Sequence, residues 1–217
     1  MTRAALVLLA LLGCHSSSST AAADAAPSAR PKIVRPRVVA TGEMPLDLAQ
    51  SKLHLVMVKD HVTPVDATMS FRDGALGASS TRLSVDLDSF DSQIAIRSER
   101  VRNIFFETSA IGWESAELAF ELPAALVAEL HEKKTLSKAK LEGTLKVHGG
   151  TSKLPVTVDA GYEGAKVWVK SVGPVDVKVS DLGLTDNLRR LNAICMHDSI
   201  DDVVKVDVSL VFNPPSH

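Results

Sequence analysis

The sequence predicts an all-β protein, an antiparallel barrel or sandwich of about eight strands with two short helical segments. Apolar and polar residues alternate with a period of two in one segment after another, which is typical of strands buried on one face only. Only two segments are expected to be helical, and both are short. Aromatic residues are few, so Val, Leu and Ala are expected to form most of the core. A barrel of about eight strands either fills its interior with side chains or holds one small ligand there.

The clearest strands form a hairpin over residues 138–162. From 138 to 148 the odd-numbered residues are apolar or glycine, and the even-numbered residues are polar. From Leu154 to Tyr162 the even-numbered residues are apolar. Gly149 and Gly150 can adopt positive φ and are expected to form the tight turn between the strands. Because a lone hairpin cannot bury its apolar face, the rest of the chain must supply the opposite wall.

The other elements are predicted in chain order from the same patterns. The remaining strands are expected at 51–58, 65–71, 82–88, 115–122, 166–179 and 204–212. The second of these should end in a turn at Arg72-Asp73-Gly74, and the strand 166–179 should bend near Gly173-Pro174. Helices are expected over 91–105, capped by Asp91 or Ser92, and over 123–133, where proline is tolerated in the first turn. The stretch around 182–202 is expected to be irregular.

The N-terminus is expected to be a processing segment that is absent from the fold. After Arg3, an apolar run over 4–12 is too short to span a bilayer. It ends in Leu11-Leu12-Gly13-Cys14, which resembles the bacterial lipobox, in which the cysteine is acylated before cleavage. This predicts a lipoprotein signal peptide (1–13), an acylated Cys14 with a flexible Ser/Ala/Pro-rich tether (14–43) and one domain (44–217). A plain signal peptide with an incidental cysteine is the alternative.

Charge and motifs argue against nucleic-acid binding and against catalysis. Asp and Glu number 26 against 24 Lys and Arg, so the chain has no basic footprint for nucleic acid. Neither the G-x-S-x-G nor the G-x-G-x-x-G motif is present. Cys195 beside His197 could form a reactive or metal site, but the preferred interpretation is a small buried hydrophobe. No catalytic residue, metal or cofactor is therefore expected.

Several segments, in this order, resemble the YceI-like family over roughly 45–212. They are the acidic strand 85–90, the segment 97–106 ending in Phe105-Phe106, residues 143–149 with Thr151, and 180–184. The resemblance implies an eight-stranded lipocalin-like antiparallel barrel in the periplasm. It also implies an isoprenoid chain inside the barrel, as in the better-known members of the family.

The alternation and the resemblance together predict a lipid-binding interior. A tunnel lined by Val and Leu suits an alkyl or prenyl chain, since burial of each CH₂ stabilises binding by roughly 0.8 kcal/mol. The expected ligand-binding residues are Leu83, Val85, Leu87, Phe105, Leu118, Phe120, Leu141, Leu145, Val156, Val158, Val206 and Val208. The expected function is that of a non-catalytic, membrane-anchored envelope lipoprotein that binds a long-chain lipid or isoprenoid. The alternative is a structural or interaction module of the envelope whose barrel is filled by its own side chains.

Overall fold

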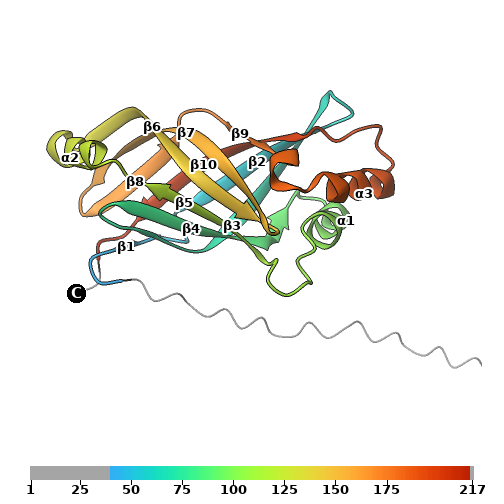
Figure 1. Ribbon diagram of the computed structural model, residues 1–217, viewed down its shortest axis with the longest axis horizontal. Helices are drawn as coiled ribbons and strands as arrows, with labels where there is room; N and C mark the ends of the chain where they lie inside the picture. Colours follow the sequence, from blue (N-terminus) through green and yellow to red (C-terminus); the bar gives the residue numbers. More distant parts are fainter. Residues whose placement is uncertain (1–39, 216–217) are drawn as a thin grey trace, which may run out of the picture. The chain divides into compact units, whose positions relative to one another are not determined.

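The computed structural model describes residues 40–215 (Figure 1). The predicted signal peptide, the predicted acylation site Cys14 and most of the predicted tether lie outside the described residues. Within residues 40–215, no helix combines the length and the apolar content needed to cross a bilayer.

Strands make up most of the described chain. They are β1 (Met44–Pro45), β2 (Lys52–Lys59), β3 (Thr63–Leu76), β4 (Ser80–Asp91), β5 (Ser115–Glu121), β6 (Thr135–Val147), β7 (Gly150–Glu163), β8 (Lys166–Ser171), β9 (Val175–Lys178) and β10 (Val203–Phe212). The helices are α1 (Ala95–Arg100), which continues as the π-helix η1 (Val101–Phe105), then α2 (Ala124–Lys133), the 3-10 turn η2 (Ser180–Leu182) and α3 (Thr185–Cys195).

Eight long strands close into an antiparallel barrel in the order β3-β2-β10-β8-β7-β6-β5-β4, and pairing of β3 with β4 completes the ring. Closure matters because an open sheet would leave a row of unpaired backbone groups at each edge. The short strands β1 and β9 pair with β3 and β10 outside this path. The predicted fold class is therefore confirmed.

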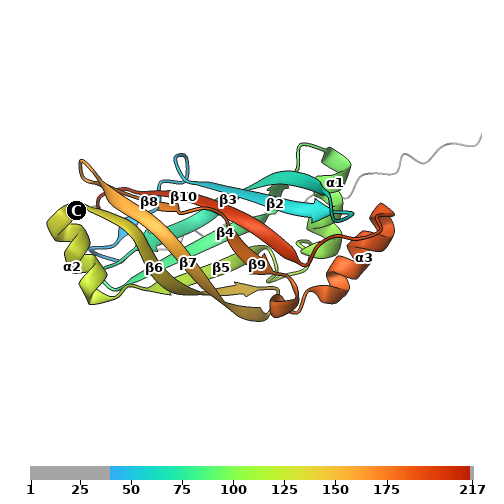
Figure 2. The same cartoon turned by 90° about the horizontal axis from the view of Figure 1, so that it is seen from above.

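The two ends of the barrel differ in how they are covered (Figures 1 and 2). α2 lies at one end, where the Tyr162 hydroxyl is 2.9 Å from Nδ1 of His131 in that helix. Behind it, the fully buried Phe212 and Val167 pack with Leu46, so side chains fill this end. α1, η1 and α3 lie at the opposite end of the barrel.

The expectation of an irregular stretch at 182–202 is wrong, because α3 occupies Thr185–Cys195. Leu184, Leu188, Leu191 and Cys195 recur at intervals of three to four residues, which is the signal of an amphipathic helix. These residues pack against the barrel core. Residues 40–215 thus contain three short α-helices, and Cys195 lies on the apolar face of the third.

Three local predictions also need correction. β3 does not turn at Arg72-Asp73-Gly74 but continues to Leu76 through a bulge, with Gly74 packed closely against Leu83. α1 has Ile94 at its N-cap and no side-chain cap, because Asp91 instead accepts a 2.8 Å hydrogen bond from the Gln93 amide.

The third correction concerns the turn of the hairpin. It is made by His148 and Gly149, which both have positive φ, whereas Gly150 already belongs to β7. A Cβ at Gly150 would overlap the backbone carbonyl of Leu182, so glycine is required there for close packing rather than for the turn. The predicted bend near Gly173-Pro174 is present and separates β8 from β9.

Candidate ligand-binding cavity

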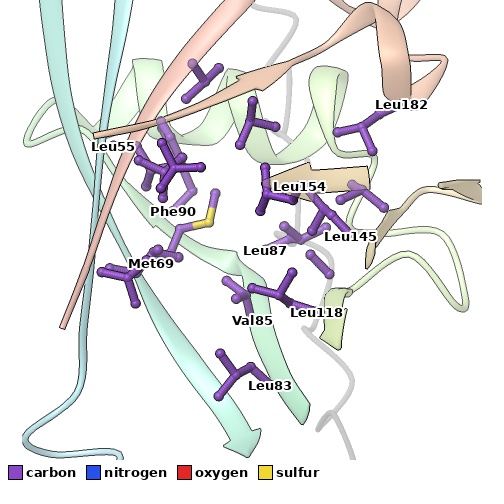
Figure 3. Close-up of a pocket in the computed structure, with 18 of the residues that line it drawn as sticks. Leu55, Met69, Leu83, Val85, Leu87, Phe90, Leu118, Leu145, Leu154 and Leu182 are labelled. Carbon is purple, nitrogen blue, oxygen red and sulfur yellow. The ribbon is translucent and has the colours of Figure 1, made fainter. Parts of the chain in front are cut away.

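The barrel encloses an apolar cavity of about 190 Å³ in its half nearer α1 and α3. Side chains from opposite strands, such as Met69 and Leu145, point toward one another across it (Figure 3). Ser171 has the only polar side chain in its wall, and its Oγ already accepts a 3.1 Å hydrogen bond from the Val208 amide. Apolar cavities of about 150 Å³ stay dry and bind small hydrocarbons, so this interior suits an apolar guest rather than water.

The structure places eleven of the twelve predicted ligand-binding residues in the wall of this cavity. They are Leu83, Val85, Leu87, Phe105, Leu118, Phe120, Leu145, Val156, Val158, Val206 and Val208. All except Phe105, which comes from η1, lie on barrel strands where the period-two alternation turns them inward. Leu141 is the exception, although its partner across the sheet, Val156, does line the cavity.

Leu141 lies next to the contact between Phe120 and Gly143 on the same face of the sheet. Phe120 on β5 pairs with Gly143 on β6, and its ring lies over the space that a side chain at 143 would occupy. Leu141 lies two residues from Gly143 along the same face of β6. Phe120 is the part of the wall next to Leu141, and we call it the floor of the cavity, although on β7 the wall continues past this level to Val158.

The wall also contains residues that the sequence prediction did not include. β2 contributes Leu53, Leu55 and Met57, and β9 contributes Val175 and Val177. Val175 and Val177 alternate with Asp176 and Lys178, as in the predicted strands. In β2 the alternation is weaker, because the apolar Val56 stands between Leu55 and Met57. Residues 101–106 and 182–184 also reach the wall from the helical end, where a period of two gives no guidance.

A second cavity, of about 50 Å³, lies beneath α3 and adjoins the first. The two share five wall residues: Met57, Val101, Phe105, Val179 and Val204. The smaller cavity also reaches charged side chains, namely Lys59, Arg97, His197 and Asp201. At the α1–α3 end the apolar interior thus adjoins a charged rim, and we call this end the mouth.

At the mouth, Glu107 of the 106–114 loop contacts both α3 and the β6–β7 turn. Its Oε1 accepts a 2.6 Å hydrogen bond from Nη2 of Arg190 on α3, and its Oε2 is 2.9 Å from Nε2 of His148 in the β6–β7 turn. The Trp113 ring lies against the His148 imidazole, with ring centroids 3.5 Å apart. The hydrogen bond from the Arg190 guanidinium, together with the nearby positive charge, holds the pKa of Glu107 below its ordinary value despite partial desolvation. This cluster fixes α3 against the end of the barrel.

The structure gives Cys195 and His197 separate partners. Nδ1 of His197 lies 3.5 Å from Oδ2 of Asp60, and Sγ of Cys195 lies 3.8 Å from Nη1 of Arg100. Among residues 40–215, no three His, Cys, Asp or Glu side chains gather in a group able to hold a metal ion. The half-buried Cys195 packs against the core from α3.

Fold and cavity together define a closed antiparallel barrel with an apolar interior. Residues 45–212 match the model of the YceI-like domain, and the chain belongs to this family. A polyisoprenoid-binding domain from Saccharophagus degradans, implicated in plant cell wall breakdown, has a similar fold. It aligns with a TM-score of 0.70 and 22% identity over 81% of this chain and 100% of that chain.

BcnA of Burkholderia cenocepacia also has a similar fold, with a TM-score of 0.54 and 16% identity over 76% of this chain and 98% of that chain. At these identities the two solved structures support the fold alone. No curated protein matches the sequence.

Proposed function

We propose that the protein is an envelope lipoprotein that binds one long-chain lipid or isoprenoid inside its barrel and does no chemistry on it. The observation that carries the proposal is the apolar cavity of about 190 Å³, whose only polar wall side chain is already hydrogen-bonded. An apolar wall stabilises a bound chain by burying the apolar surface of that chain. Each buried CH₂ group contributes roughly 0.8 kcal/mol to binding, so a long chain is favoured over a short one. The wall contains no titratable side chain that could act as an acid, a base or a nucleophile.

Two further findings support the same function. The similar domain from Saccharophagus degradans is a polyisoprenoid-binding domain. The apolar cavity wall of the present barrel is suited to an apolar chain of that kind. The lipobox-like Leu11-Leu12-Gly13-Cys14 supports attachment to the membrane through an acylated Cys14, on the periplasmic side of a bacterial envelope. Acylation with more than one chain would hold such a protein stably at the bilayer.

Organic extraction of the purified protein, followed by mass spectrometry, tests this function. The expected result is a long-chain species in near-stoichiometric amount, released only when the protein is denatured or extracted. A protein that repeatedly yields no such species, and takes up none when offered prenyl alcohols and phospholipids, would instead be a structural or interaction module.

A further inference from the structure

On one of its two edges, β7 is hydrogen-bonded to a neighbouring strand along only part of its length. On this edge β7 pairs with β8, and the Val172 amide donates one further hydrogen bond of 2.8 Å to the Thr157 carbonyl. The chain then bends away from β7, and β9 pairs with β10 instead. In the described part of the chain, no pairing joins the rest of β7, residues 150–156, to β9. We call this unpaired stretch between β7 and β9 the seam.

The sequence keeps the seam unpaired from both sides. Gly173, which has a φ of 76°, and Pro174, which has no amide hydrogen, turn the chain away from β7. Along β7, the backbone groups of alternate residues point to the same neighbouring strand, so those of Pro155 face the seam, as those of Thr157 face β8. Pro155 therefore has no amide to donate to β9, and within sheets proline is confined mainly to such unpaired edges.

The seam is part of the wall of the larger cavity. Leu154 and Val156 line the cavity from β7, and Val175 and Val177 line it from β9. Between these two strands only the packing of side chains closes the wall, whereas a ladder of backbone hydrogen bonds joins the other edge of β7 to β6. The seam can therefore widen without breaking a backbone hydrogen bond between strands.

Both ends of the barrel would be harder to open than the seam. At the α2 end, Phe212 and Val167 are fully buried. At the mouth, Val101, Phe105 and Leu184 are buried and belong to the core. Because protein cores are close-packed, a chain that entered along the barrel axis would have to displace several of these side chains together.

We propose that the seam is a lateral gate through which an apolar chain enters and leaves the cavity. The proposal rests on the proposed function, since it concerns the path of the lipid into that cavity. The acyl or prenyl chain passes between β7 and β9, while its polar headgroup stays in water beside the exposed residues Lys153, Asp176 and Lys178. Because the chain enters sideways, both packed ends of the barrel stay closed.

A disulfide across the seam tests the gate. The protein is the chain from residue 14 with Cys14→Ser and Cys195→Ala, so that only the introduced cysteines can pair. The seam variant carries Lys153→Cys and Asp176→Cys, and the matched control carries Lys153→Cys and Thr144→Cys, on strands that are already paired. We expect the seam disulfide to slow uptake and release of cis-parinaric acid at least about tenfold in stopped-flow fluorescence, equivalent to about 1.4 kcal/mol of added barrier. Reduction should restore both rates, and the control disulfide should leave them unchanged.

Hydrogen exchange of the parent protein is a second test, which needs no variant. The Lys153 amide faces the seam, so in the lipid-free protein it should exchange at least about tenfold faster than the Leu154 amide, which faces β6. Equal protection of these two amides, or unchanged uptake by the seam variant with its disulfide formed, would overturn the gate. A parent protein that takes up no cis-parinaric acid and yields no extracted lipid would instead overturn the proposed function, whatever the exchange at the seam.

Discussion

The ring of Phe120 lies over Gly143 on the neighbouring strand and lines the cavity. Gly143 makes this possible because any side chain there would overlap the ring. We expect the pair to limit how far an apolar chain extends along β5 and β6, because Leu141, two residues farther along β6, is not part of the cavity wall.

Phe120→Ala should deepen the cavity and bring Leu141 into its wall. We expect the co-purified lipid to shift toward longer chains, as read by mass spectrometry. Without lipid, removing the half-buried ring should lower the free energy of unfolding by less than the about 3–5 kcal/mol typical of a fully buried Phe, and a bound chain should restore part of this loss by filling the space. Val167→Ala is the control, because it removes volume from the filled end, outside the cavity wall. An unchanged chain length in Phe120→Ala would contradict the role of this ring as the floor.

Gly143→Ala tests the contact between Phe120 and Gly143 by changing the glycine instead of the ring. The added methyl group would push the Phe120 ring away from β6 and into the cavity. We expect shorter chains or less lipid per protein, together with a lower melting temperature if the ring is forced off its rotamer. A variant with normal lipid content and normal melting would show that the ring has other space to occupy.

Glu107→Gln should loosen α3 from the mouth. Loss of the charged hydrogen bond to Arg190 should lower the free energy of unfolding by about 1 kcal/mol near neutral pH. Because the folded-state pKa of Glu107 is depressed, its contribution is fully present above the ordinary value near 4.5 and is lost as the pH falls through the folded-state pKa. The difference between parent and variant should therefore shrink below about pH 4.5 in denaturant titrations. Glu163→Gln, at an exposed carboxylate at the end of β7, is the control for removing one negative charge from the surface.

Cys195→Ala should leave lipid content and metal content unchanged. The thiol is half-buried among apolar residues of α3 and the barrel, so alanine removes little packing volume. Elemental analysis and lipid extraction of the parent and variant proteins check this expectation. A transition metal that is bound by the parent and lost in the variant would instead assign Cys195 and His197 to a metal site.

The sequence alone was enough to predict where most barrel strands lie and which of their residues point inward, because apolar and polar residues alternate along these strands. It predicted which side of β6 carries Leu145 and which side of β7 carries Val158. It could not reveal that Leu141 lies outside the cavity wall, or that a ring from β5 lies over a glycine of β6. That contact joins residues 23 positions apart and leaves no local pattern.

The helical end was harder to predict for a different reason. The apolar spacing of α3 was present in the sequence, but Gly183 before it and the polar run at 185–187 resemble a loop. The cluster at the mouth consists of Glu107 from a loop, Arg190 from a helix and His148 from a hairpin turn. These residues are far apart in the sequence, so only the folded structure shows that they are in contact. The pairing of His148 with Glu107 was not predicted.

Cys14→Ser should detach the protein from the membrane. Without the thiol no acyl group can be added, and the apolar run over 4–12 is too short to span the bilayer by itself. Fractionation of cells should show the variant as an unprocessed precursor or in the soluble envelope fraction. Membrane attachment equal to that of the parent protein would contradict acylation at Cys14.

The variants Leu145→Phe and Val158→Phe test whether the barrel interior is occupied by lipid. Leu145 on β6 and Val158 on β7 both line the cavity, and either ring adds volume there without adding charge. In an interior filled by its own side chains, the added ring should lower the free energy of unfolding by about 1–3 kcal/mol. In a lipid-binding interior, the ring takes space that the lipid used, so the delipidated variant should melt close to the delipidated parent while carrying less lipid after purification. Lys146→Phe adds the same ring at an exposed position of β6 and should change neither quantity. Full lipid content at normal stability in both cavity variants would mean that these two side chains do not contact the ligand.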